Sequence, residues 1–375
     1  MRAAVAGAGI AGLTSAIALA QRGISVDIFE RAPDLQEIGA GIQLSPNATA
    51  LLERLGLMAD LADHLVEPEA IEIHDGSSGR KLAAIPLGAA ARRRYRASYC
   101  LIRRADLQAG LLAAVRQHPN ILLHVSAELG DVEAERNGIA FSAGGRKHSA
   151  DLLVAADGLH SHLRTDYFGH PGPRPLGHIA WRATLPADSV PAAIDMRVTG
   201  LWLGPGTHLV HYPVAGGKHL NVIVIAAGNA ADAAPPKACF RHQARHLLDA
   251  IDAWTRWPLY EVDAALPWVR GQAVLIGDAA HAMAPSAAQG GAQAIEDAFA
   301  LAATIAAHSD IASGLKDYER VRRSRVEKIA RMARTNLAIY EMRGFSAAAR
   351  NGVLGVLPAS FLHSRFDWIF AEGFR

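Results

Sequence analysis

Two glycine-rich motifs lie almost the whole chain apart: GAGIAG at residues 7–12 and VLIGDAAHAMAPSAAQGG at residues 274–291. The first lies between an apolar stretch that alternates little and a run with helical periodicity, which predicts a strand–turn–helix that holds a dinucleotide. The second has the same order of apolar strand, turn and helix. We expect both motifs to bind the same ligand, which requires the two ends of the chain to fold into one α/β unit.

The first motif predicts a βαβ unit in which each glycine has a separate task. Gly7 permits the tight turn, Gly9 lets the backbone approach a pyrophosphate, and Gly12 lets the helix pack closely on the strand. Glu30 ends the second strand, where a carboxylate can accept both hydroxyls of an adenosine ribose. An acid at this place disfavours a 2′-phosphate, so the cofactor is FAD or NAD and not NADP. The unit is expected over Ala3–Ala6, Ile10–Gln21 and Ser25–Glu30.

The second motif adds a polar group and a helix end at the far side of the ligand. A strand over Ala273–Ile276 would carry Asp278 to the carboxyl edge of the sheet, where its side chain can accept from hydroxyls. The turn at Gln289, Gly290 and Gly291 then opens a helix whose positive end favours an electron-rich ring. We interpret His281 as a packing residue. Helical periodicity continues from Gly291 to about Arg343.

Composition excludes several other classes of protein. Half of the 375 residues are apolar and a fifth are charged, which fits a large globular core. A net charge of +2 gives no case for nucleic-acid binding. Cys100 and Cys239 form no C-x-x-C pair, so we expect a reducing cytoplasm. No stretch reaches the roughly 18 apolar residues of a membrane span, and no signal peptide is expected at the start.

The pattern of the chain changes twice, which predicts a second domain inserted in the first. Residues 71–97 read as a strand and a loop, and residues 172–267 as β segments interrupted by prolines, including Thr207–Val214 and Leu220–Ala226. A helix capped near Asp106 lies between these two stretches. We predict an α/β fold with a discontinuous Rossmann-like domain of the glutathione-reductase type (1–70, 98–171 and 268–335), an inserted β-sheet domain (71–97 and 172–267) and a C-terminal helical segment (336–375).

A third motif, DGLHSHLR at residues 157–164, stands between the other two. With all three in this order, the chain resembles the single-component FAD-dependent aromatic hydroxylases, a group that includes salicylate and 3-hydroxybenzoate hydroxylases. The resemblance covers nearly the full length and implies non-covalent FAD, with NAD(P)H and O2 as co-substrates. A shorter stretch, IPLGAAARRRYRASYCLIRRADL, is similar to the corresponding part of 6-hydroxynicotinate and salicylate hydroxylases.

The resemblance also implies the residues that contact the cofactor. The arginine before Ala-Asp-Leu would contact the flavin, and the spacing leaves Arg103 and Arg104 both possible, with Arg104 favoured. Asp157 would lie near the pyrophosphate, although an Asp-Gly pair can also be a simple turn. The expected cofactor contacts are Gly7, Gly9, Gly12, Glu30, Arg31, Arg104, Asp157, Asp278, Gly290 and Gly291.

The strand THLVHYPV carries the expected substrate contacts. Alternation places His208 and Tyr212 on one face and His211 on the other. The resemblance assigns the histidine four residues before the tyrosine to the substrate, which selects His208, and it adds Gln289 and Pro285 at the flavin edge. Gln43 replaces a histidine of the 6-hydroxynicotinate enzyme, which weakens the case for that substrate.

The resemblance implies that a C4a-hydroperoxide of the reduced flavin hydroxylates a small phenolic or hydroxylated heteroaromatic acid. His208, with a pKa near the working pH, would withdraw the phenolic proton. Alternatives within the family are a urate-type hydroxylase and an isoprenoid epoxidase. Outside it remain an NAD(P)-linked dehydrogenase and a flavoprotein that does not oxygenate. A metal site at His160 and His162 has no third ligand in the sequence, and the chain is expected to be a monomer or homodimer.

Overall fold

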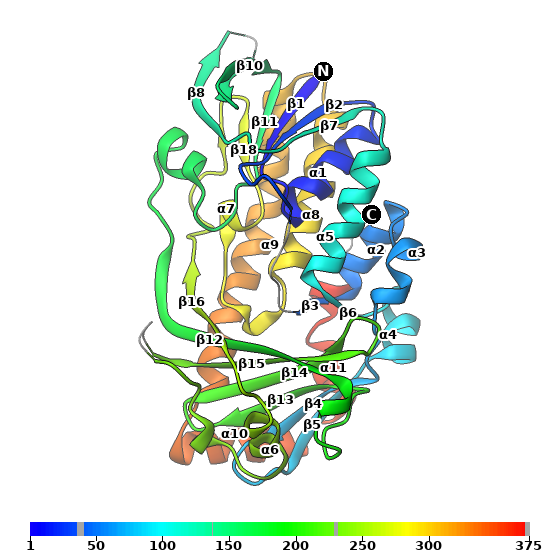
Figure 1. Ribbon diagram of the computed structural model, residues 1–375, viewed down its shortest axis with the longest axis vertical. Helices are drawn as coiled ribbons and strands as arrows, with labels where there is room; N and C mark the ends of the chain where they lie inside the picture. Colours follow the sequence, from blue (N-terminus) through cyan, green and yellow to red (C-terminus); the bar gives the residue numbers. More distant parts are fainter. Residues whose placement is uncertain (36–40, 137, 229–231, 372–375) are drawn as a thin grey trace.

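A six-stranded sheet forms the upper part of the computed structural model, which describes residues 1–35, 41–136, 138–228 and 232–371 (Figure 1). Five neighbouring strands are parallel, and β17 joins antiparallel at one edge. Three of the parallel strands, over Ala273–Leu275, Leu152–Ala155 and Arg2–Ala6, are apolar and almost wholly buried, as strands covered on both faces must be. In spatial order the strands are β17 (Val269–Arg270), β18 (Ala273–Leu275), β11 (Leu152–Ala155), β1 (Arg2–Ala6), β2 (Ser25–Phe29) and β7 (Ile121–His124).

Helices cover one face of this sheet and a small antiparallel sheet covers the other. Helix α1 (Ile10–Ala20) packs between α5 (Arg104–Gln117) and α8 (Gly290–Ala307). Alanine and glycine dominate α1 and α8, so the two helix backbones come close together and almost every residue is buried. The small sheet contains β8 (Leu129–Glu135), β9 (Gly138–Ala143) and β10 (Arg146–Ala150). This arrangement is the predicted Rossmann-like α/β fold.

A seven-stranded sheet crosses the lower part of the molecule (Figure 1). Its outer face packs Trp181, Leu209 and Val224 against α6 (His242–Asp249), and its inner face looks toward the six-stranded part. The strand order is β16 (Thr255–Glu261), β12 (Arg174–Pro186), β15 (His219–Ala227), β14 (Thr207–Val214), β13 (Thr199–Gly204), β4 (Ala70–Asp75) and β5 (Lys81–Pro86).

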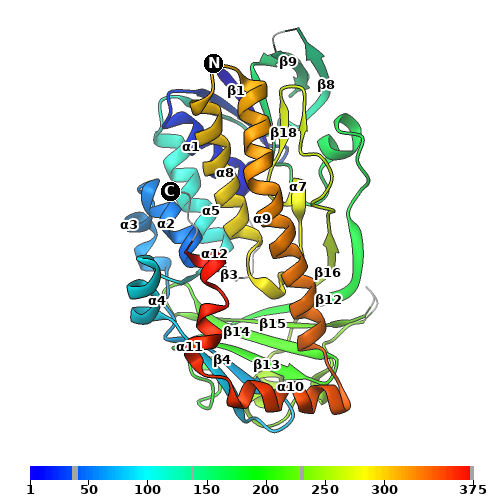
Figure 2. The same cartoon turned by 180° about the vertical axis from the view of Figure 1, so that it is seen from behind.

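The long helix α9 (Ile311–Tyr340) runs from one part of the molecule to the other (Figure 2). After it, α10 (Gly344–Val356) and α11 (Ala359–Ser364) pack against β5, and α12 (Asp367–Phe370) returns to α2 (Pro46–Arg54). The last described helix therefore packs against the part of the molecule that contains the first motif. The remaining strands and α-helices are β3 (Gly41–Leu44), α3 (Met58–Leu61), α4 (Gly88–Tyr95), β6 (Cys100–Arg103) and α7 (Asp278–His281).

Three local predictions were wrong in detail. The loop expected within 71–97 is the strand β5 followed by the helix α4. The helix expected to be capped near Asp106 begins at Arg104, and Asp106 lies in its first turn, where its carboxylate pairs with Arg103. The helical run from Gly291 to Arg343 is two helices, which Asp310 separates by capping α9 with a bond from the Ser313 amide at 2.9 Å.

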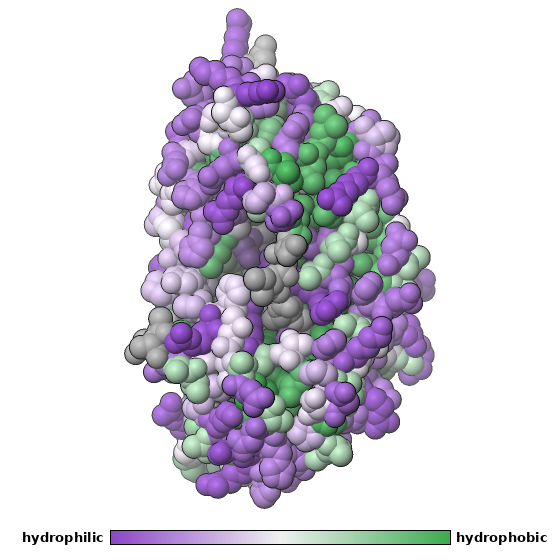
Figure 3. All heavy atoms as spheres, in the orientation of Figure 1, coloured by the Kyte–Doolittle hydropathy of each residue, from purple (hydrophilic) through white to green (hydrophobic). Residues whose placement is uncertain are grey.

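Polar residues cover most of the face drawn in Figure 3, with apolar residues showing mainly near its top. Leu122 in the edge strand β7 and Val125 directly after it are exposed. Within the described part of the chain, no helix combines the length and apolar character that crossing a membrane requires.

Candidate active site

The first motif forms a turn in which side chains at Gly7 and Gly12 would clash with neighbouring backbone atoms. Gly7 has φ +97°, and a Cβ there would lie 2.6 Å from the Ala156 carbonyl oxygen. A Cβ on Gly12 would lie 1.9 Å from the Gly7 oxygen, so only glycine permits this contact between helix and strand. Gly9 differs, because nothing lies within 4 Å of its Cβ position. The open side of the turn is therefore the side on which a ligand fits.

Glu30 is held in place by two backbone amides. Its Oε2 accepts from the Ala8 N–H at 2.8 Å and its Oε1 from the Ala32 N–H at 2.9 Å. The side chain lies at the wall of a cavity of about 290 Å3. The residues that line this cavity include Gly7, Gly9, Glu30, Arg31, Asp34, Arg104, Gln108, Asp157, Gly158 and His162. Six of the predicted cofactor contacts thus share one cavity.

The two candidate arginines have different surroundings. Arg103 makes a two-pronged ion pair with Asp106, with both N···O distances 2.7 Å, and this pair raises the pKa of its guanidinium. Arg104 lines the cavity with Gly9 and Glu30. The structure thus places Arg104, and not Arg103, where a dinucleotide would fit.

Asp157 is the buried acid of the cavity. Its Oδ2 accepts from the Leu163 N–H at 3.2 Å, whereas its Oδ1 is buried with no hydrogen-bond partner among the described residues. Burial raises its pKa above the usual range, against the lowering effect of the bonds from Ser161 and Leu163. A buried acceptor without a donor is costly unless a ligand supplies the donor. The neighbouring Arg164 is structural, since it donates to the carbonyls of Leu159 and Ala279.

The second motif lies beside the first. Strands β18, β11 and β1 are parallel neighbours, so Gly277 and Gly7 follow carboxyl ends at the same edge of the sheet. Gly277 has φ +57°, and its Cβ would approach that of Ala11 in α1 to 2.9 Å. Asp278 follows at the start of α7 and is half-buried. The two ends of the chain therefore meet at one site.

Gln289 lies at the N-terminus of α8, inside a buried cluster of polar side chains. Its Nε2 donates to Ser45 Oγ at 2.9 Å, and its Oε1 accepts from Asn47 at 3.3 Å and Gln293 at 3.1 Å. Asn47 also donates to Glu296 at 2.6 Å. The amide that was expected to touch the substrate is used within the protein, where it fixes the start of α8. Gly290 has nothing within 4 Å of its Cβ position and leaves that helix end open.

A group of buried charges behind α8 was missed in the sequence. Arg322 of α9 is fully buried and pairs with Glu296 and, at 2.8 Å, with Asp297. His281 lies 2.6 Å from Asp297 as well, so it is a hydrogen-bonded core residue. Burial alone would raise the pKa of Asp297, but the charges of His281 and Arg322 hold it below the usual range. The i, i+3 pair Arg322 and Arg325 on one helix face was the available signal.

His208 and Tyr212 share the inner face of the seven-stranded sheet. His208 lies against Tyr340 of α9, with 5.2 Å between ring centroids, and Tyr212 packs near Gly41 and Leu101. His211 points to the other face, against Gly200 and Trp202. The alternation along β14 is thus as the pattern indicated.

The pKa of the His208 imidazole differs from the expected one. Its side chain is buried, and neither ring nitrogen has a hydrogen-bond partner among the described residues. Burial, with a smaller effect from His178, lowers its pKa to about 3. The expectation of a pKa near the working pH was therefore wrong for the protein alone, because desolvation disfavours the charged ring. The ring is neutral and can accept a hydrogen bond.

The remaining predicted residues lie around the same face. Pro285 begins a short turn before Gln289, and its neighbours Ala284 and Ala287 pack with Ala180 and Ile225 of the sheet. Gln43 accepts from the Tyr99 hydroxyl at 2.6 Å. Gly39 and Ala40, which start the predicted glycine loop before it, lie outside the described residues.

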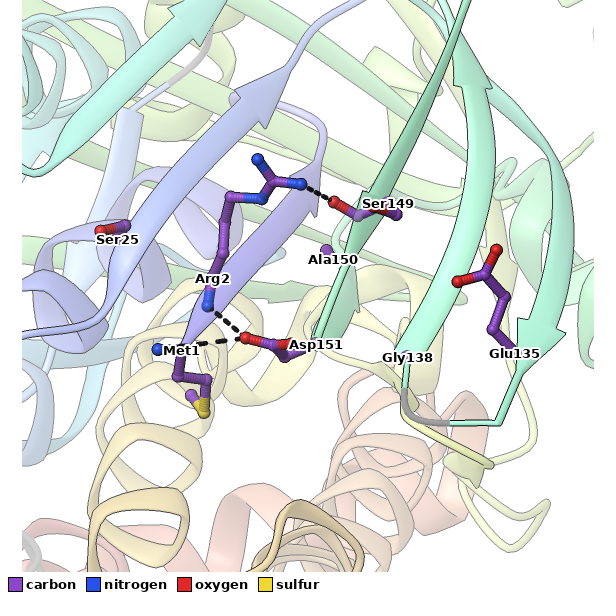
Figure 4. Close-up of a pocket in the computed structure, with 8 residues that line it drawn as sticks. All are labelled: Met1, Arg2, Ser25, Glu135, Gly138, Ser149, Ala150 and Asp151. Atoms are coloured by element: carbon purple, nitrogen blue, oxygen red, sulfur yellow. Dashed lines mark hydrogen bonds and ion pairs between the residues drawn. The ribbon is translucent and has the colours of Figure 1, made fainter.

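A second hollow lies where β1 and β2 begin, lined by Met1, Arg2, Ser25 and Asp151 among others (Figure 4). It has a volume of about 480 Å3, and in it the Asp151 carboxylate holds the Arg2 amide at 2.7 Å. It is an open notch beside the chain start, with none of the motif residues. His162 lines the first cavity and His160 contacts Tyr260. No group of three potential metal ligands occurs in the parts of the chain that the structure describes.

The first cavity fits a flavin dinucleotide. The glycine cradle, the open side of Gly9, the acceptor Glu30 and the unpartnered Asp157 oxygen match a ligand with phosphates and hydroxyls. The α8 end at Gly290 offers unpaired amides to a second, electron-rich part of the same molecule.

Comparison with known proteins agrees with this fit. A family model described as "FAD binding domain" matches residues 1–333. The chain is 33% identical over 384 residues to a 3-hydroxybenzoate 6-hydroxylase of Aquipseudomonas alcaligenes, covering 98% of this chain and 97% of the relative. It is 36% identical over 343 residues to a 3-amino-4-hydroxybenzoate 2-monooxygenase of Streptomyces cremeus, covering 89% and 86%.

A solved structure gives the same result for the fold. Klebsiella pneumoniae HpxO, crystallised with FAD and uric acid, superposes with a TM-score of 0.86 at 26% identity, covering all of this chain and 96% of the other.

Proposed function

Since the chain belongs to the FAD-binding family of flavoprotein monooxygenases, we propose that it hydroxylates a small hydroxylated aromatic acid. The observation that carries the proposal is the inner sheet face. It presents a neutral buried histidine and a tyrosine, and Ala284 and Ala287, in the segment that leads into α8, pack on the same face against Ala180 and Ile225. The relatives that act on hydroxybenzoates favour this class of substrate over urate or an isoprenoid.

FAD is the cofactor of the family, and Gly7, Gly9, Glu30, Arg104 and Asp157 would hold its dinucleotide part. Asp278 and the amides at Gly290 and Gly291 would hold the ring end. When bound and reduced by NAD(P)H, FAD supplies the chemistry that activates O2 for transfer to the ring. The α8 N-terminus stabilises negative charge next to it.

His208 accepts a hydrogen bond from the phenolic hydroxyl. As the neutral imidazole attracts the hydroxyl proton, the phenolic oxygen donates more electron density into the substrate ring, which makes the carbons ortho and para to the hydroxyl more nucleophilic. Tyr212 borders the same space and holds a second substrate oxygen. Apolar residues of the sheet and of α9, including Ile225 and Leu337, exclude water from the reacting atoms.

Co-substrates, compartment and assembly form part of the proposal. NAD(P)H would bind transiently, because the sequence has no second glycine motif. The two cysteines are free, which supports a cytoplasmic enzyme. We propose a monomer or homodimer.

A substrate screen tests the proposal. Purified holoenzyme is given NAD(P)H and each of the hydroxybenzoates and hydroxypyridine carboxylates, and both NAD(P)H oxidation and hydroxylated product are measured. We expect at least one acid to give product in proportion to NAD(P)H consumed. Oxidation that yields only hydrogen peroxide with every acid would overturn the proposal.

A matched pair of variants tests the role of His208. His208→Gln should lower kcat with the true substrate by about 100-fold, the usual contribution of a positioned acid–base group. His211→Gln is the control, because His211 is equally buried on the same strand but faces away. Equal losses in both variants would show that burial and not substrate contact explains the effect.

A further inference from the structure

The inner face of the seven-stranded sheet carries a cation that the motifs do not account for. Strand register places Arg182 opposite Ile223, and Ile223 opposite Val210. The next row contains Thr184, Asn221 and Tyr212. Directly opposed residues of antiparallel strands share a face, so Arg182 and Asn221 lie on the face of Tyr212 and are diagonal neighbours.

Both side chains have hydrogen-bond donors without acceptors. Arg182 Nε and Asn221 Nδ2 are buried and find no partner among the described residues. The amide oxygen of Asn221, in contrast, has a partner, because it accepts a hydrogen bond from the Gly41 N–H at 2.9 Å. Asn221 is therefore fixed with its NH2 group free, and its side chain is 0% exposed. Unmade bonds of buried donors are costly, which points to an acceptor that comes from outside the chain.

The charges around Arg182 favour an anion. Burial lowers the pKa of its guanidinium, and the nearby Arg104 lowers it further, while Tyr212 acts in the opposite direction. Its guanidinium also lies 5.5 Å from the centre of the Trp257 ring, which neutralises no charge. Among the described residues, the side chain that Arg182 contacts is thus an aromatic ring and not a carboxylate, so its positive charge has no counter-charge there.

The position of this group relative to His208 fits one aromatic ring. His208 lies two residues along and two strands across from Arg182. With ~3.3 Å per residue and ~4.8 Å per strand, the two Cα atoms are about 12 Å apart. The Arg182 guanidinium lies beside Trp257 and close enough to Tyr212 to interact with it electrostatically, so a ring with an acidic group at one end and a hydroxyl toward the other can span the distance to His208.

We propose that Arg182 and Asn221 form the subsite for the carboxylate of the aromatic substrate, with the substrate hydroxyl directed to His208. This rests on the proposed function and deepens it, because it makes the enzyme selective for anionic arenes. The planar guanidinium and the amide donate to the two carboxylate oxygens, which is the geometry that arginine recognises best. A neutral arene of the same shape leaves the buried cation without its counter-charge.

The test compares one acid with its neutral analogue. Binding of 3-hydroxybenzoate and 3-hydroxybenzamide to the oxidised holoenzyme is measured by the change in flavin absorbance, without NAD(P)H. Wild type should bind the acid at least tenfold more tightly than the amide. Arg182→Gln should weaken binding of the acid by about 10- to 100-fold, as expected for the loss of a hydrogen bond to a charged group. Its binding of the amide should change by less than about threefold.

Two further variants complete the test. Arg174→Gln is the matched control, because this arginine lies on the same strand, is mostly exposed and pairs with Glu261, so neither ligand should be affected. Asn221→Asp keeps Arg182 and adds a negative charge, and should abolish the preference for the acid.

Two results would overturn the proposal: a wild type that binds the acid no better than the amide, or an Arg182→Gln variant that loses both ligands equally. The proposed function fails on a different result, NAD(P)H oxidation without hydroxylated product.

Discussion

The substitution Gly9→Ala should weaken binding of the cofactor while it leaves the folding of the first motif unchanged. Gly9 precedes α1 with φ −75° and ψ −175°, a backbone that alanine adopts without strain. No protein atom lies within 4 Å of the added Cβ. The methyl group therefore disturbs nothing in the protein and points into the space where a pyrophosphate would approach the backbone.

The structure sets the size of the two effects. Without a clash, the free energy of unfolding of the apoprotein should change by less than about 1 kcal/mol. An extra methyl group in a closely packed contact costs about 1–3 kcal/mol. FAD should therefore bind about 5- to 150-fold more weakly. Gly12→Ala gives the opposite expectation, since its Cβ would lie 1.9 Å from the Gly7 oxygen and the fold itself should fail.

The assay is a fluorescence titration of the apoprotein with FAD, together with thermal unfolding of the same samples. Gly172→Ala serves as the control, because it also has no atom within 4 Å of its Cβ but lies outside the cavity. FAD affinity at the wild-type level in Gly9→Ala would refute the argument that this side of the turn faces the cofactor. A large loss of apoprotein stability would refute the claim that the side is open.

Three further outcomes are expected. Arg322→Met should lower the free energy of unfolding by about 3–5 kcal/mol in urea titrations, because Glu296 and Asp297 stay buried without their counter-charge; a loss below 1 kcal/mol would contradict this. Arg104→Ala should weaken FAD binding by about tenfold, or about 1.4 kcal/mol, whereas Arg103→Ala should not, and equal effects would reverse the assignment. Burial lowers the pKa of both His208 and His211 to about 3, below the ordinary 6.5. Their neutral forms therefore stabilise the fold fully above pH 6.5, and this stability is lost as the pH falls toward 3. The melting temperature should fall less between pH 7 and 5 in a His208→Gln, His211→Gln double variant than in the wild type, and an equal fall would contradict the assignment.

The sequence predicted those helices and strands whose conformation is determined by residues close together in the chain. GAGIAG permits few conformations, so the start of α1 and the turn before it followed from the letters alone. The strand Thr207–Val214 was predicted with its observed bounds, because its alternation is regular and prolines and glycines border it. The helix α4 was not, since its short run of alanines and arginines has weak periodicity and depends on packing against the C-terminal helices through the Arg94–Asp367 pair.

The buried charges show where prediction from one sequence stops. Glu296 and Asp297 on α8 face Arg322 and Arg325 on α9, and Arg325 also donates to the backbone oxygens of Trp368 and Ile369 in α12. Each of these residues reads as a solvated helix position until the partner helix is placed. Only the tertiary contact between three segments makes them core residues, and a pattern within one helix contains no information about that contact.

His208 and His211 show the same limit of prediction for the chemistry of the site. Alternation along β14 assigned them to opposite faces, because the side-chain period of a strand is two. It could not assign their pKa values, which depend on how completely both faces are covered. Both rings are buried and burial lowers both pKa values to about 3, so burial alone does not distinguish the proposed functional histidine from the other one. The two rings differ in what they contact: His211 lies beside Trp202 on the outer face, and His208 lies against Tyr340 of α9 on the inner face. A phenol that binds there would bring the hydrogen-bond donor that the His208 nitrogens lack.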